Sequence, residues 1–132
     1  MAYTPLQHPH LRVAYHNVTV AEYNAGFYII PPSPGRYITV VDCWMRSAGN
    51  TTECTSIDLT DGTTSAAVFL AAALTNGTMC RIGASNTTAT NLGTTSARGT
   101  GIKVLSQGTD ETTATAVEVC VYYTVSSTAA AS

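Results

Sequence analysis

Apolar and polar residues alternate along most of this 132-residue chain, in short runs separated by turn residues. An alternation with a period of two is typical of β-strands, because successive side chains of a strand point to opposite faces. Thr, which is abundant here, is β-branched and favours a pleated strand over a helix. The pattern predicts strands over residues 11–20, 26–30, 36–46, 54–60, 63–70, 79–83, 101–105 and 114–125.

Three of these runs are regular enough for their two faces to be named. The predicted faces are Leu11, Val13 and Tyr15 against Arg12, Ala14 and His16; Ile38, Val40, Asp42 and Trp44 against Tyr37, Thr39, Val41, Cys43 and Met45; and Val117, Val119, Val121, Tyr123 and Val125 against Glu118, Cys120, Tyr122 and Thr124. The third run is the clearest. Because Tyr122 and Tyr123 are adjacent, one of them must face outward or into a neighbour.

Turn residues mark the ends of the strands. Asp61-Gly62 predicts a two-residue hairpin loop, since both positions tolerate positive φ, and Asn76-Gly77 has the same turn chemistry. Residues 66–74 are alanine-rich, which favours a helix, but the flanking turns lead us to expect a strand there. Residues 85–101 have no apolar period and predict a long surface loop.

About eight short strands and no strong amphipathic helix predict an all-β fold. We expect a single-domain antiparallel β-sandwich, jelly-roll-like, with a β-barrel or β-tulip as the alternative. The predicted organisation is an extended N-terminal arm over residues 1–10, the sandwich over 11–125 and a small-residue tail over 126–132.

Two segments of the chain are similar to each other. The first segment comprises residues 38–41 and 49–59, and the second comprises residues 102–105 and 108–119. Each segment has a strand, a polar turn and a second strand that begins in small residues. This similarity suggests two like hairpins that face each other across the sandwich. Chance in a Thr-rich chain explains it about as well.

The charge balance narrows the range of partners. Only 11% of the residues are charged and the net charge is −2, whereas an average domain has about 25% charged residues. The six basic residues are scattered, so we expect no nucleic-acid partner. No apolar run has the length of a membrane span, so we expect no membrane partner. The N-terminus has no secretory signal, so we expect the protein to be made in the cytoplasm. A weakly charged, Thr-rich surface can be covered by a partner at little electrostatic cost.

The cysteines do not point to a metal or to a fixed disulfide framework. Their spacing contains no Cys-x-x-Cys pair, and we expect buried free thiols, with disulfides left open. The four are Cys43, Cys54, Cys80 and Cys120.

Catalytic chemistry is sparse in the sequence. The three histidines are His8, His10 and His16, and no nucleophile motif accompanies them. His8 and His10 could form a metal site at a symmetry axis, but a polar N-terminal arm is the preferred interpretation. Most carboxylates lie in turns, where Asp caps the backbone. We expect no enzyme activity, no cofactor, no metal and no small-molecule substrate.

The seven tyrosines exceed what a small core needs, and Tyr is favoured at protein interfaces. We predict contacts with other proteins from the arm, the long loop and the outward tyrosine of the last strand. The candidate interface residues are Tyr3, Leu6, His8, His10, Asn86, Asn91, Arg98 and Tyr122.

The runs PGRYITVVD at 34–42, TSIDLTDGTT at 55–64 and TAVEV at 115–119 resemble small virion structural proteins of tailed bacteriophages. The resemblance covers about residues 18–125 and is greatest to capsid decoration (cement) proteins. It implies a homotrimer on the outer capsid surface of the virion that binds the major capsid protein lattice and stabilises the mature head. The alternative is a receptor- or glycan-binding tip domain of a phage tail fibre or spike.

Overall fold

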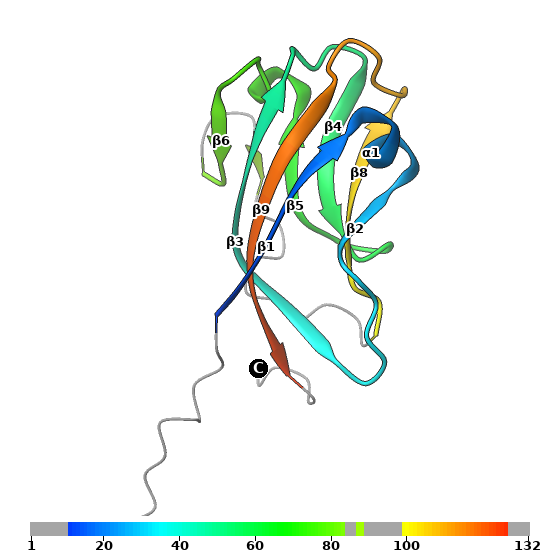
Figure 1. Ribbon diagram of the computed structural model, residues 1–132, viewed down its shortest axis with the longest axis vertical. Coiled ribbons are helices and arrows are strands. Elements are labelled where there is room, and N and C mark those ends of the chain that lie inside the picture. The colour runs from blue at the N-terminus through cyan, green and yellow to red at the C-terminus, as the bar shows by residue number, and fades with distance from the viewer. Residues whose placement is uncertain (1–10, 84–86, 89–98, 127–132) are drawn as a thin grey trace, which may run out of the picture.

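The chain folds into two antiparallel sheets packed face to face, in a computed structural model that describes residues 11–83, 87–88 and 99–126 (Figure 1). The strands are β1 (Arg12–Thr19), β2 (Phe27–Ile30), β3 (Tyr37–Ala48), β4 (Cys54–Thr60), β5 (Ser65–Leu70), β6 (Met79–Arg81), β7 (Thr87–Thr88), β8 (Ile102–Gly108) and β9 (Ala116–Ser126). A short helix, α1 (Val20–Ala25), follows β1, and a 3₁₀-helix at Ala71–Ala73 follows β5.

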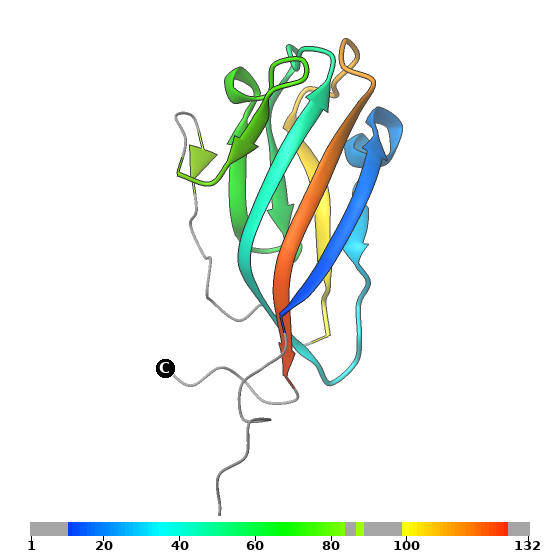
Figure 2. The same ribbon diagram turned by 60° about the vertical axis from the view of Figure 1, so that its left-hand side comes forward.

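The strand order is that of a jelly roll, which confirms the predicted fold. One sheet has the order β1-β9-β3-β6 and the other β2-β8-β4-β5-β7. Most consecutive strands lie in different sheets, so the chain crosses repeatedly from one sheet to the other, as two Greek keys require. Figure 2 shows the four-stranded sheet in front, with β1, β9 and β3 side by side. The two-residue β7 extends the other sheet beside β5.

The core lies between the sheets and is built from their inward-facing apolar residues. Ile57 and Phe69 are register partners on β4 and β5, and both are fully buried. Burial of a side chain of this size contributes about 1.5–3 kcal/mol. The other large, fully buried apolar residues include Val18, Tyr23, Val40, Met45, Leu59, Leu74, Ile102, Val104, Val117, Val119 and Val121.

The predicted faces hold for β9 and change part-way along β3. On β9, Val117, Val119 and Val121 are fully buried in the core, as the alternation predicts. On β3 the register shifts between Val40 and Asp42, which indicates a β-bulge. One extra residue at a bulge reverses the faces beyond it. The prediction that Cys43 and Val40 lie on opposite faces is therefore wrong, because both are buried in the core.

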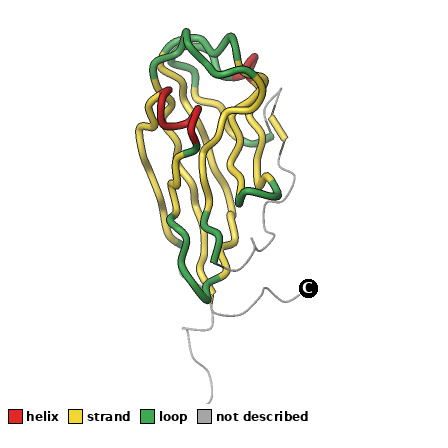
Figure 3. The backbone as a smooth tube through the Cα atoms, turned by 90° about the vertical axis from the view of Figure 1, so that its right-hand side faces the viewer, coloured by secondary structure: helices red, strands yellow, loops and turns green. Residues whose placement is uncertain are grey.

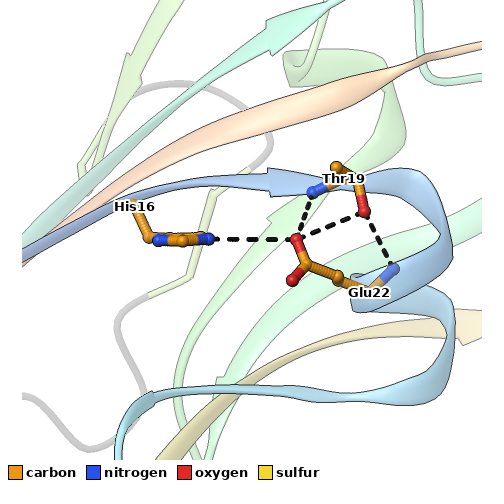
Figure 4. Close-up of polar contacts among 3 residues, drawn as sticks. All are labelled: His16, Thr19 and Glu22. Carbon is orange, nitrogen blue, oxygen red and sulfur yellow. Dashed lines mark hydrogen bonds and ion pairs between the residues drawn. The ribbon is translucent and has the colours of Figure 1, made fainter.

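The helix α1 was not expected from the apolar pattern, because it spans only six residues. Its signal is a capping box: the Thr19 hydroxyl accepts a hydrogen bond from the Glu22 N–H, and the Glu22 carboxylate accepts one from the Thr19 N–H (Figure 4). A capping box satisfies two N–H groups that a helix start leaves without partners. The strand predicted over residues 11–20 therefore ends at Thr19.

Two predictions around β5 need correction. The strand predicted over residues 66–74 ends at Leu70, and the alanines that follow form the 3₁₀-helix, in line with their low β-propensity. The loop at Asp61-Gly62 has four residues, 61–64, because Thr60 pairs with Ser65. The Asp61 carboxylate accepts hydrogen bonds from the N–H groups of Thr63 and Thr64, which stabilises this wider turn.

The two similar segments are not hairpins. The strand β3 pairs with β9, and β4 pairs with β8, so each segment crosses between the sheets and lies beside the other. The long loop predicted over residues 85–101 contains β7, and most of that range lies outside the described residues. The arm over 1–10 and residues 127–132 of the tail lie outside them as well.

The two loops that join these strands, 49–53 and 109–115, are fastened together by two glutamates. The Glu111 carboxylate is 1% exposed and accepts hydrogen bonds from five backbone N–H groups, three in the first loop and β4 and two in its own loop. The Glu53 carboxylate accepts reciprocally from the N–H groups of Thr112 and Thr113. The sequence similarity thus has a structural counterpart, in which each loop supplies a carboxylate to the other. Figure 1 shows these loops together at the upper end of the sandwich, and Figure 3 shows that end covered by loops.

All four cysteines are free and buried. Burial raises the pKa of the Cys43 thiol to about 12 and that of Cys54 to about 11. Within the described part of the chain, no helix has the length and apolarity that crossing a membrane requires.

Candidate protein-interaction surface

The first strand presents its more apolar face to solvent. Val13 and Tyr15 are 57% and 54% exposed, whereas Ala14 and Val18, on the other face, pack against the core. The second sheet covers only the face of β1 that carries Ala14 and Val18, so Val13 and Tyr15 lie in solvent. A sheet face that carries large apolar side chains in solvent marks a surface that another molecule can cover.

The neighbouring strands extend this apolar surface. The register places Trp44 of β3 and Tyr15 of β1 on either side of Cys120 of β9, and Tyr122 between Val13 and Asp42. Five of the six exposed large apolar residues among the described ones lie on these strands or beside them. We call the apolar face the set Leu11, Val13, Tyr15, Val41, Trp44, Met79 and Tyr122. Its residues lie on or beside the strands of the four-stranded sheet, which is in front in Figure 2.

Two aromatic rings form the centre of the apolar face. The ring centroids of Tyr15 and Trp44 are 6.2 Å apart with an interplanar angle of 48°. Both residues are register partners of Cys120, which points outward and yet is only 4% exposed. Tyr and Trp are the residues that most often dominate binding energy at protein interfaces.

The charged groups on this face are paired. The Arg46 Nε lies 2.8 Å from the Glu118 Oε1, and the Tyr15 hydroxyl donates to the same carboxylate. The Tyr15 hydrogen bond, followed by that from Arg46, lowers the pKa of Glu118. The Arg81 guanidinium lies 3.9 Å from the Asp42 carboxylate. Because each charge has a partner of opposite sign, covering the face leaves no isolated charge behind.

A second polar cluster lies at the start of α1. His16 Nε2 is 3.9 Å from Glu22 Oε1 (Figure 4). The imidazole stacks on Phe27, with ring centroids 4.4 Å apart. The carboxylate already serves the capping box with Thr19. The cluster therefore fixes the junction of β1 and α1. Among the residues that the structure describes, no group of three His, Cys, Asp or Glu side chains could hold a metal ion.

Asp58 is the buried carboxylate of the other sheet. It is 6% exposed, and it accepts hydrogen bonds from the hydroxyls of Ser56 and Ser65. Burial raises its pKa, and these two hydrogen bonds oppose the rise. Because Ser56 lies on β4 and Ser65 on β5, the Asp58 carboxylate links two strands of one sheet, and we assign it a structural role.

Of the predicted interface residues, Tyr122 lies on the apolar face, while Tyr123 packs against the core. The other seven lie outside the described residues: Tyr3, Leu6, His8, His10, Asn86, Asn91 and Arg98.

Sequence reasoning missed Val13, Tyr15, Trp44 and Met79 as surface residues. Alternation identifies the two faces of a strand, but it does not say which of them is buried. The polarity of β1 gave the opposite signal, because Arg12 and His16 lie on the same side as the inward-facing Ala14. No known protein family, curated protein or solved structure matches this chain.

Proposed function

We propose that this protein is a non-enzymatic binding module that attaches to another protein through its apolar face. The partner we propose is the major capsid protein lattice of a tailed bacteriophage, which the module decorates from outside and stabilises. The observation that carries the proposal is the exposed apolar side of β1, with Val13 and Tyr15 more than half exposed. The resemblance in sequence supplies the capsid as the partner.

Physical chemistry supports a role in binding. Removing apolar surface from water yields about 25 cal/mol per Å², and aromatic residues at the centre of an interface contribute most of the binding energy. Jelly rolls form capsid and lectin domains among others, so the fold alone does not select a function. The paired charges and the Tyr15–Trp44 rings are what favour a protein partner.

Attachment of this kind stabilises a shell by mass action, since a ligand that binds only the mature lattice shifts the equilibrium toward it. We propose a homotrimer, in which three weak contacts act together through their effective concentration. Closed symmetry would prevent runaway polymerisation. Sedimentation of the free protein tests this proposal, because a homotrimer should have three times the 13.8 kDa mass of one chain.

The apolar face is tested by Val13→Ser and Tyr15→Ser, measured as occupancy on purified shells that lack the protein. Each variant should weaken attachment about tenfold or more, because a central contact is worth more than about 1.4 kcal/mol. Both positions are solvent-exposed, so the thermal midpoint should stay close to that of the wild type. Tyr28→Ser is the matched control, since Tyr28 is 43% exposed on the other sheet and lies beneath the Lys103 ammonium.

Equal occupancy for Tyr15→Ser and wild type would reject the apolar face as the attachment surface. Quantifying the chain against the shell subunit in virions tests the partner. A copy number comparable with that of the shell subunit supports decoration, whereas a much smaller number would assign the chain to a tail-fibre or spike tip.

A further inference from the structure

A cavity lies against the connection from β2 to β3, at the end of the sandwich opposite the two linked loops. Figure 1 shows this connection at its lower end. Its volume is about 250 Å³. Ile30 and Ile38 form its inner wall and are 5% and 3% exposed. Two arginines, Arg12 and Arg36, line it as well. A concave site with an apolar wall and convergent polar groups is the usual form of a binding site.

The position of Arg12 is unusual for a charged residue. Its register partner is Tyr123, which packs against the core, and alternation places it on the inward side of β1 with Ala14 and Val18. Arg12 and Arg36 are both solvent-exposed, so their guanidinium groups are accessible to a ligand that approaches from outside. Arg36 lies across the cavity, at the end of the connection that leads into β3.

Within the described residues, neither arginine has an ion pair or a side-chain hydrogen bond, whereas Arg46 and Arg81 both face carboxylates. No acidic side chain lines the described part of the cavity. Two positive side chains that line one cavity favour an anion as its occupant. A guanidinium pair presents forked N–H donors that match a planar carboxylate.

We propose that this cavity binds one carboxylate side chain, Asp or Glu, of the protein to which the module attaches. The proposal rests on the proposed function and deepens it, because it names a polar anchor beside the apolar face. The volume accepts a short acidic side chain and is below the range of about 300–1,000 Å³ of pockets for larger ligands. The charges supply complementarity, and the isoleucines accommodate the methylene groups.

The ligand chemistry is tested on the full chain by titrating sodium acetate and, separately, inorganic phosphate while following the arginine side-chain N–H signals by NMR. Acetate should shift the signals of Arg12 and Arg36 saturably, and R36Q should abolish the saturable shift at Arg12. K103Q removes the same charge from the other sheet and should leave both shifts unchanged. A shift that does not saturate, or saturation by phosphate at lower concentration than acetate, would overturn the proposal.

The source of the carboxylate is tested by attachment to shells. R12Q and R36Q should each lower occupancy about tenfold or more, while K103Q stays within about twofold of wild type. Acetate binding together with unchanged occupancy would mean a free small carboxylate and would overturn the proposed partner side chain. If the arginine variants attach normally and Tyr15→Ser does not, only this inference fails. If Tyr15→Ser attaches normally too, the proposed function fails and the inference with it.

Discussion

At the scale of single residues, the most constrained side chain is that of Glu111. Its carboxylate is buried without a cation, and backbone N–H groups supply the compensation instead, at donor–acceptor distances of 2.9–3.3 Å. Asn24 adds support, because its side chain bonds both the N–H and the C=O of Glu111. A charge held in this way fixes two loops in one geometry and leaves little freedom for substitution.

Glu111→Gln should lower the free energy of unfolding by about 2–4 kcal/mol, measured by urea denaturation. The amide nitrogen would face backbone N–H donors, so some of them would be left buried without an acceptor. Glu118→Gln is the control, because its ion pair with Arg46 is partly exposed and should cost less than about 1 kcal/mol. A loss at Glu111 no larger than that at Glu118 would contradict the structural role given to Glu111.

The pH dependence of stability should follow Glu53. Hydrogen bonds from the Thr52 hydroxyl and the Thr112 N–H lower its pKa below that of an unfolded Glu, about 4.3. Its contribution is therefore fully present above about pH 4.3 and is lost as the pH falls through the folded-state pKa. In urea titrations over a series of acidic pH values, Glu53→Gln should lose stability less steeply than wild type.

Asp58→Asn provides a control of opposite sign. Burial raises the pKa of Asp58 above that of an unfolded Asp, about 3.9, so the wild type gains stability from this group as the pH falls through the raised value. The variant lacks that gain and should lose stability more steeply in acid. If the unfolding free energies of the three proteins fall in parallel as the pH is lowered, groups other than Glu53 and Asp58 determine the loss of stability in acid.

At the scale of elements, the strands with one buried face were predictable and the exceptions have local causes. The alternation of β9 identified both its faces, because its inward valines and its outward Glu118 differ clearly in polarity. The bulge in β3 has no such signal, since Val40 and Val41 are alike in the sequence and only the register distinguishes them. The helix α1 is too short for a periodic pattern, so only its capping box at Thr19 could have revealed it.

The candidate site was less predictable than the fold, for a related physical reason. Burial is a property of the assembled sheets, whereas alternation is a property of one strand. Tyr15 is a surface residue because the other sheet packs against the opposite face of β1, which carries Ala14 and Val18. The glutamate pair likewise needs two loops separated by about half the chain to meet, which no local pattern reports.

The junction of β2 and β8 depends on the absence of a side chain at Gly101. Its φ is +70°, and an added Cβ would lie 2.5 Å from the Ile30 carbonyl oxygen and 2.7 Å from the Pro32 nitrogen. Because both are backbone atoms, Gly101→Ala should cost about 2–4 kcal/mol of unfolding free energy. Gly62→Ala also has positive φ but meets nothing within 4 Å, so about 1 kcal/mol is expected there. Thermal or urea unfolding of both variants measures the difference, and equal losses would contradict the close approach.

At the scale of the whole molecule, the sandwich separates two regions of different character. One end is closed by the linked loops, and the other carries the arginine-lined cavity and the junction at Gly101. Strands of a sandwich transmit little strain between well-separated sites, so changes at the two ends should act independently.

The combination of Glu111→Gln with Gly101→Ala tests this independence. Their unfolding free energies should add within about 0.5 kcal/mol, because the sites are distant and share no partner. Glu111→Gln combined with Glu53→Gln is the contrasting pair, since the Thr113 N–H donates to both carboxylates. Chemical denaturation of the single and double variants should show coupling in the second pair alone. Coupling of equal size in both pairs would mean that the two ends are not independent.

The cysteine beneath the aromatic pair gives the molecule a natural reporter. Cys120 is 4% exposed on the outward side of β9, between its register partners Tyr15 and Trp44, so a thiol-reactive dye reaches it only when the packing around it loosens. The rate of labelling at this sulfur therefore reads out how often the centre of the sheet surface opens. A bound partner would slow that labelling without any engineered tag.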